Sequence, residues 1–237
     1  MKPISFFFLC CFITCVGFSQ ESNVATDSTK ALDKRYKEDQ FYFSITYNLM
    51  ANKPSNISQT GFSSGFHLGF IKDMPINKRR NLAIGLGFGL ARSSFNHNLL
   101  INKDESGTYT FEKLNSLDNV TYTKNRLINY LVEVPFEFRW RSSTADSYKF
   151  WRIYSGVKFG YSLYNAAKYK GSLGKITLDN IDGFNKFQYG ATLGFGYNTW
   201  NFHIYYALTP LFENNARVNG NTIDINEIRI GLIFYML

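Results

Sequence analysis

The feature that most constrains this chain is an alternation of large apolar side chains with small or polar ones, which recurs in eight segments. In residues 82–91, leucine, isoleucine or phenylalanine occupies every second position, and glycine or alanine fills the positions between. A two-residue period predicts β-strands with two unlike faces. The eight segments are residues 41–49, 62–70, 82–91, 128–140, 151–163, 187–197, 202–209 and 228–237.

The lengths of these segments and of their connections favour a membrane barrel. Each segment has about the 9–11 residues with which a tilted strand crosses a bilayer. The connections alternate between short and long, as in outer-membrane barrels, whose short turns lie in the periplasm. We predict an all-β fold, an eight-stranded antiparallel up-and-down transmembrane β-barrel formed by residues 41–237. The short connections are 74–80, 141–148 and 198–201, and the longer polar ones are 50–60, 98–121, 168–185 and 213–222.

A soluble β-sandwich or a lipocalin-like barrel would show the same alternation with its aromatic face turned inward. The glycines argue against this alternative, because Gly85, Gly87 and Gly89 on a solvent face would only weaken the strand. On the inner wall of a narrow barrel they leave room for larger side chains opposite. We therefore predict a filled interior and an aromatic face toward lipid. Aromatic residues expected in interfacial girdles are Tyr42, Trp140, Trp151, Tyr161, Tyr189, Tyr197 and Tyr206.

Charged side chains on the inward face form the candidate site. The fourth and fifth segments are neighbours, so Glu133 and Glu137 are expected to reach Lys158 and Arg152. Buried charges must be paired, which favours a salt-bridged plug over the alternative of an ion path or gate. Pro135, in the middle of the fourth segment, predicts a bulge or a local bend. The predicted network comprises Glu133, Glu137, Arg139, Arg152, Lys158, Glu227 and Arg229.

The orientation of the last segment stays open. If Glu227 and Arg229 point inward, Phe234 and Met236 point toward lipid. If the terminal residue faces lipid, Tyr235 and Leu237 lie there instead. Either way, the C-terminal sequence FYML resembles the signal that barrel-assembly machinery recognises.

Residues 1–19 are predicted to be a signal peptide. Lys2 gives a basic start, an apolar stretch follows at 6–18, and Gly17 and Ser19 are the small residues that signal peptidase accepts. All three cysteines of the chain lie in this segment, so a protein cleaved near Ser19 and Gln20 is exported and free of cysteine. Residues 20–40 are polar and are predicted to form a flexible periplasmic leader.

The order of these features is similar to that of the PorT-like outer-membrane β-barrel proteins of Bacteroidota. The fourth segment contains the motif Tyr-Leu-Val-Glu-Val-Pro-Phe at residues 130–136. The family usually has an aromatic residue two positions before the glutamate, where this chain has Leu131, with Tyr130 one position earlier. The resemblance covers roughly residues 41–237 and implies an outer-membrane barrel. One member of the family is tied to type IX secretion, so an accessory role in such a machine is an alternative.

One modification site is suggested in the leader. The sequence Asp27-Ser28-Thr29 fits a short sequon that resembles the O-glycosylation signal of exported Bacteroidota proteins. It lies in a polar segment where a transferase could reach the Ser28 hydroxyl. The alternative is a plain solvated spacer.

Catalytic motifs are incomplete in this chain. The pair His203-x-Tyr205 resembles the His-x-Ser of lipid A deacylases, but tyrosine replaces the nucleophile. His97 near Ser93 or Ser94 matches the barrel acyltransferases in residue type and not in spacing. We expect the histidines to be hydrogen-bonded in the interior.

Metal binding and nucleic-acid binding have no support in the sequence. No two of the histidines have metal-ligand spacing, and the one basic cluster, at residues 78–80, sits in a short turn. We expect no enzymatic activity, cofactor, metal or nucleic acid.

The expected function is that of a non-catalytic integral outer-membrane protein with a structural or surface-interaction role through its extracellular loops. The expected partners are outer-membrane lipid and lipopolysaccharide, and the barrel-assembly machinery during insertion. Secretion-system proteins are possible further partners. A lipid-modifying enzyme is the least favoured alternative.

Overall fold

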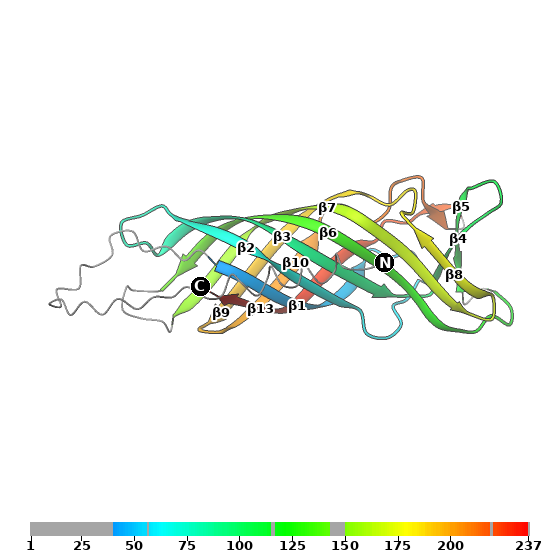
Figure 1. The fold of residues 1–237 in the computed structure, drawn as a ribbon, viewed down its shortest axis with the longest axis horizontal. Helices are drawn as coiled ribbons and strands as arrows, with labels where there is room; N and C mark the ends of the chain where they lie inside the picture. Colours follow the sequence, from blue (N-terminus) through cyan, green and yellow to red (C-terminus); the bar gives the residue numbers. More distant parts are fainter. Residues whose placement is uncertain (1–39, 56, 115–116, 143–149, 219, 237) are drawn as a thin grey trace, which may run out of the picture. The chain divides into compact units, whose positions relative to one another are not determined.

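The computed structural model describes residues 40–55, 57–114, 117–142, 150–218 and 220–236. Eight long strands form a closed antiparallel ring, in which each strand pairs with the next and the last pairs with the first (Figure 1). The predicted fold class is confirmed. No helix in the described ranges is long and apolar enough to span a membrane. In ring order the strands are β1 (Gln40–Ala51), β2 (Ser64–Pro75), β3 (Leu82–Asn96), β6 (Tyr122–Arg141), β7 (Trp151–Gly171), β9 (Phe187–Tyr197), β10 (Trp200–Ala207) and β13 (Asn226–Met236).

Three features predicted near the N-terminus lie outside the described residues. They are the signal peptide at 1–19, the leader as far as residue 39, and the candidate glycosylation site Ser28. They stay predictions.

Side chains alternate across the barrel wall in the predicted sense. Along β3, Leu86, Phe88 and Leu90 are about half exposed, whereas Ala83 and Ala91 are buried. A wall with an apolar outer side and a small or charged inner side suits a barrel surrounded by lipid.

The last strand turns Glu227 and Arg229 inward. Both are at most 1% exposed, whereas Met236 is 55% exposed. Tyr235 also points into the barrel, where its ring centroid lies 5.7 Å from that of Tyr154. This arrangement decides between the two orientations that the sequence left open.

The predicted girdle position of Tyr42 is wrong. Its side chain is 2% exposed and fills the interior beside the paired glycines Gly69 and Gly89. A Cβ atom added to Gly69 would lie 2.7 Å from the Tyr42 ring, and one added to Gly89 would overlap the Tyr42 hydroxyl. The glycines of the inner wall thus make room for a large side chain, which is Tyr42. Trp151 and Tyr161, by contrast, are exposed on the outer wall.

Pro135 causes no bulge in β6. It pairs with Lys158 in unbroken register, and the irregularities of the β6–β7 ladder occur near 122–124 and 130–131. On the other side, the β3–β6 ladder omits two consecutive pairs, Gly87 with Pro135 and Phe88 with Val134, and resumes in the same register. A missing N–H donor therefore removes ladder bonds there without shifting the strands.

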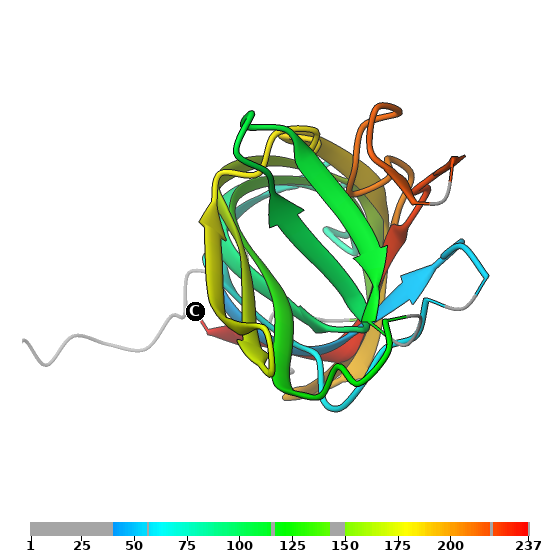
Figure 2. The same ribbon diagram turned by 90° about the vertical axis from the view of Figure 1, so that its right-hand side faces the viewer.

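The longer connections, expected to be polar, contain short strands and an apolar core. The β4–β5 hairpin runs across the mouth of the barrel (Figure 2). β8 extends the sheet by pairing with the outer part of β7. These elements are β4 (Leu99–Lys103), β5 (Tyr109–Lys113), β8 (Gly174–Asp179), β11 (Arg217–Val218) and β12 (Asn221–Thr222).

Candidate functional site

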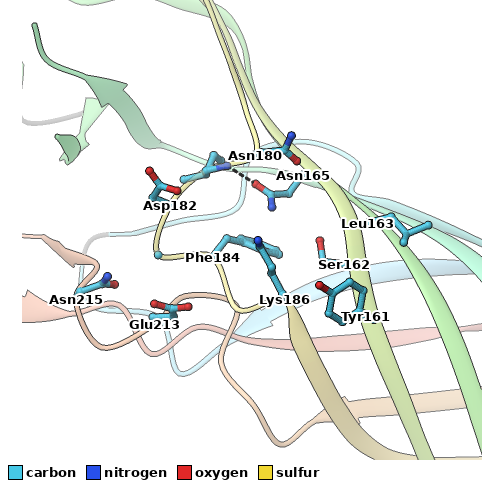
Figure 3. A pocket seen from close by; sticks show the side chains of 12 residues that line it. Tyr161, Ser162, Leu163, Asn165, Asn180, Asp182, Phe184, Lys186, Glu213 and Asn215 are labelled. Carbon is cyan, nitrogen blue, oxygen red and sulfur yellow. Dashed lines mark hydrogen bonds between the residues drawn. The ribbon is translucent and has the colours of Figure 1, made fainter. Parts of the chain in front are cut away.

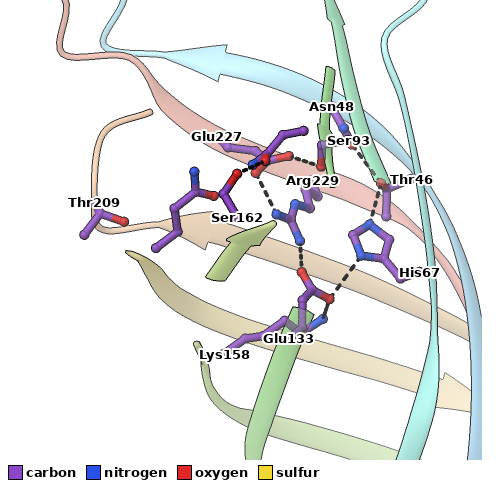
Figure 4. A network of polar contacts seen from close by, with 12 residues as sticks. Thr46, Asn48, His67, Ser93, Glu133, Lys158, Ser162, Thr209, Glu227 and Arg229 are labelled. Carbon is purple, nitrogen blue, oxygen red and sulfur yellow. Dashed lines mark hydrogen bonds and ion pairs between the residues drawn. The ribbon is translucent and has the colours of Figure 1, made fainter. Parts of the chain in front are cut away.

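Glu133, on β6, is the centre of a polar network in the lumen. Its Oε1 accepts a hydrogen bond from the guanidinium of Arg229 on β13. Its Oε2 lies 3.2 Å from His67 Nδ1 on β2 and 3.5 Å from Lys158 Nζ on β7 (Figure 4). All four side chains are at most 5% exposed. Strands β6 and β13 are opposite each other in the ring, so the contact between Glu133 and Arg229 spans the lumen.

Arg229 has partners on several sides. Its Nη2 donates to Glu227 Oε2 at 2.7 Å, and Ser93 Oγ donates to the other oxygen of Glu227, also at 2.7 Å. Its guanidinium carbon lies 4.4 Å from the ring centroid of Tyr205. Two carboxylates and one aromatic face offset the cost of removing this cation from water.

A second group of charges lies toward the end where the turns are short. Asp73 binds Arg139 at 3.0 Å and Arg141 at 2.8 Å, through different carboxylate oxygens. Arg139 Nη2 donates to Gln40 Oε1 at 2.6 Å, and its Nε lies 3.4 Å from Glu137 Oε2. Asp73, Arg141 and Gln40 were not among the residues predicted for the network. Alternate residues of a strand share a face, so Asp73 lies on the inward face of β2 and Arg141 on the inward face of β6. Both lie one to three residues beyond the predicted segments, and extending those segments would have found them.

Arg152 lies apart from the predicted network. Its Nη1 donates to the Asn198 carbonyl in the turn after β9, and its guanidinium carbon lies 4.2 Å from the Phe150 ring centroid. The expected pairing of Arg152 with Glu137 is not found, since the ion-pair partner of Glu137 is Arg139. Arg152 sits at a strand end, where turn carbonyls are within reach of its long side chain.

The ion pairs of the lumen balance in charge within the described part of the chain. They join four carboxylates to four cations, and each cation has a carboxylate within 3.5 Å. The arrangement ties strands of both halves of the ring together. The carboxylates are Asp73, Glu133, Glu137 and Glu227, and the cations are Arg139, Arg141, Lys158 and Arg229.

The three histidines are buried separately. His67 is part of the central network, and His203 Nε2 lies 2.7 Å from Thr192 Oγ1. His97 lies outside the membrane-spanning strands, where its Nδ1 accepts the Leu99 N–H at 3.2 Å. Ser93, the serine considered beside His97, donates to Glu227 instead. Among the described residues, no group of three or more His, Cys, Asp or Glu side chains could hold a metal ion.

A hydrophobic core, here called the outer cap, covers the end of the lumen opposite the short turns, which is here called the outer end. In it Phe212 packs against two other rings in edge-to-face geometry, with centroids 5.6 Å from that of Phe111 and 5.7 Å from that of Phe184. Burial lowers the pKa of the adjacent His97 to about 4. The buried side chains of the outer cap are Met50, Ile57, Phe95, Leu99, Ile101, Phe111, Leu127, Ala167, Ile181, Phe184, Leu211, Phe212, Ala216, Val218, Ile223 and Ile225.

A polar pocket of about 650 Å³ opens on the side of the outer end (Figure 3). It forms where the wall divides, because β7 pairs with β9 only as far as Tyr161 and pairs with β8 from Ala166 onward. Asn165 accepts the Ile181 N–H at 2.8 Å and fixes one edge of the opening. The lining mixes amides with charges of both signs. Its charged residues are Asp182, Lys186 and Glu213.

A closed eight-stranded barrel with a lipid-compatible exterior and a charged, filled lumen defines an integral membrane barrel protein. The model of the outer membrane protein beta-barrel domain family matches residues 18–213, and the chain belongs to this family. The protein is therefore an outer-membrane β-barrel.

No curated protein matches the chain. It is similar to the crystal structure of Ail, the attachment invasion locus protein of Yersinia pestis, in complex with the heparin analogue sucrose octasulfate. That similarity has 10% sequence identity and a TM-score of 0.38, and it covers 85% of this chain and 100% of that one.

Proposed function

We propose that this protein is a non-catalytic surface barrel, closed to solutes, which acts through its extracellular end. The observation that carries the proposal is that the lumen is obstructed twice. The contact between Glu133 and Arg229 crosses its middle, and the outer cap covers its outer end. A barrel whose lumen is filled by paired charges and apolar rings is a stable scaffold, and it leaves no path for solutes.

The extracellular end has the features of an interaction surface. It carries the β4–β5 hairpin, the extended β6–β7–β8 sheet and the polar pocket beside Asn165. Loops on a rigid scaffold commonly carry binding functions. The interior histidines support no catalytic role, because no serine of the described residues pairs with one of them.

The PorT-like motif has a structural part in this proposal. Its glutamate is Glu133, the centre of the network, and its proline is Pro135, where the β3–β6 ladder is interrupted. These roles account for the motif without a secretion machine. An accessory role in secretion would instead use the periplasmic side, including the leader that follows the proposed signal peptide and carries Ser28.

Site-specific photo-cross-linking in the native host distinguishes the two roles. The probe is placed at Glu112 or Asn214 on the extracellular side, and at Lys78 or Asn198 on the periplasmic side. All four positions lie in turns, short strands or loops outside the barrel wall. The surface role predicts cross-links from the first pair. Stoichiometric protein cross-links from the second pair alone would contradict it and favour the accessory role.

A further inference from the structure

The outward face of the β6–β7–β8 extension carries rows of like charge. Lys124 of β6 is directly opposite Lys170 of β7, which is directly opposite Lys175 of β8. In the next outward row, Arg126 is opposite Lys168. Like charges at directly opposed positions destabilise a sheet. Five cations in two adjacent rows therefore call for a compensating anion.

The protein itself does not supply that anion in its described part, where none of the five cations has an ion-pair partner. Arg126 Nε donates to Asn96 Oδ1 at 2.8 Å, which orients the guanidinium and leaves its charge unpaired. Asp179, the acid on this face of β8, accepts a hydrogen bond from the Tyr164 hydroxyl. Lys124, Lys170 and Lys175 are exposed.

A local register shift in β6 turns the side chain of Lys124 toward the outward face. The β6–β7 register shifts between Tyr122 and Lys124. Tyr122 consequently packs inward beside Tyr169, with 6.4 Å between ring centroids, whereas Lys124 points outward. In a regular strand these two side chains, which are two residues apart, would share a face, and the extra residue Thr123 places them on opposite faces.

The position of the rows identifies the partner. The same outward face continues downward into the tyrosine pair Tyr130 and Tyr164, whose centroids are 5.9 Å apart, and then into the lipid-facing wall. Tyrosine at this level is typical of a membrane interface. Arg126 and Lys168 lie four residues beyond that pair, or about 13 Å along a tilted strand. An anion that meets them approaches along the membrane surface, at headgroup height.

We propose that this face, the basic rows Lys124, Arg126, Lys168, Lys170 and Lys175, binds the phosphate groups of lipopolysaccharide in the outer leaflet around the barrel. The cations sit where the headgroups lie, and they replace part of the counter-charge that packed phosphates require. The site is on the outer wall, so it does not depend on the closed lumen or on the polar pocket.

The test uses the full-length protein in detergent with lipopolysaccharide from its host and with the same material after enzymatic removal of phosphate. The variant is Lys124→Gln/Lys170→Gln/Lys175→Gln. Its matched control, Lys72→Gln/Lys78→Gln/Arg79→Gln, removes the same charge from exposed positions at the periplasmic end. Each cation near an anionic membrane surface contributes about fivefold. The triple variant should bind intact lipopolysaccharide on the order of 100-fold more weakly, and the control should bind like the unaltered protein.

Two further readouts make the outcome decisive. In detergent without lipopolysaccharide, the triple variant should be at least as stable to heat as the unaltered protein, because the like-charge contacts of the row Lys124, Lys170 and Lys175 are gone. The single variant Lys170→Gln removes the central charge and serves if the triple variant fails to fold.

Equal binding by the row variants and the control would overturn the proposal, as would no preference for intact over dephosphorylated lipopolysaccharide. Binding of a soluble sulfated polysaccharide as tight as that of lipopolysaccharide would also reject a lipid headgroup as the ligand.

Discussion

Glu133 and Arg229 come from strands that are opposite each other in the ring, and their side chains meet in the middle of the lumen. Removing one partner leaves the other buried and uncompensated, which costs about 3–5 kcal/mol. Glu133→Gln should lower the free energy of unfolding by about that amount, measured by urea titration in lipid vesicles. The double variant Glu133→Gln/Arg229→Met should lose clearly less than the sum of the two single variants. Additive losses would show that the two side chains are not coupled.

The outer cap should unfold separately from the barrel. Phe212→Ala removes a ring that contacts both Phe111 and Phe184, and such truncations typically cost about 3–5 kcal/mol. We expect faster proteolysis within residues 98–114, while heat-modifiability on gels still reports an intact barrel. Leu173→Ala, at the exposed β7–β8 turn, is the control and should leave proteolysis unchanged. A cap that resists protease in the Phe212 variant would argue against this packing.

Acidification should loosen the same cap through His97. Its pKa is about 4 in the folded cap and about 6.5 when exposed, so the folded form favours the neutral ring. The resulting stability is complete above about pH 6.5 and declines as the pH falls toward 4, by up to about 3 kcal/mol. The protection factors of amides 98–103 against hydrogen exchange, corrected for the intrinsic pH dependence of exchange, should therefore fall between pH 7 and pH 4. In His97→Asn, whose Oδ1 can still accept the Leu99 N–H, this added pH dependence should disappear.

The orientation in the membrane is open to a labelling test. Ser172→Cys, in the β7–β8 turn, should react with a membrane-impermeant maleimide on intact cells, whereas Lys78→Cys in the β2–β3 turn should react only after lysis. The unaltered protein is the blank, because the proposed signal peptide contains every native cysteine. A tag in the 143–147 turn, which lies outside the described residues, should likewise stay hidden. The reverse labelling pattern would show that the barrel has the opposite orientation in the membrane.

The two-residue alternation was sufficient to predict the barrel, because successive side chains of a strand lie on opposite sides of the wall. The alternation also placed Glu133, Lys158 and Arg229 in the lumen. The same alternation places Tyr42 in the lumen, together with Ser44 and Thr46. Tyr42 was wrongly assigned to the girdle because that assignment relied on its being a tyrosine and not on its position in the alternation.

Partners across the lumen were harder to predict, because they depend on the closure of the ring. Neighbouring strands suggested that Glu133 would meet Lys158, which it does at 3.5 Å. Nothing local linked Glu133 to Arg229 on the opposite strand. The outer cap escaped prediction for a related reason. Its apolar residues, such as Leu99, Ile181 and Phe212, are scattered among polar ones and become a core only when four connections meet.

The claim that the barrel is closed is tested most directly by single-channel recording of the purified, refolded protein in planar lipid bilayers. Paired charges across the lumen and the outer cap predict a flat baseline over the voltage range in which porins conduct steadily. The predicted result is the absence of stable current steps, also after the cap is loosened by Phe212→Ala, because the contact between Glu133 and Arg229 remains. Steady, reproducible conductance from the unaltered protein would contradict the account.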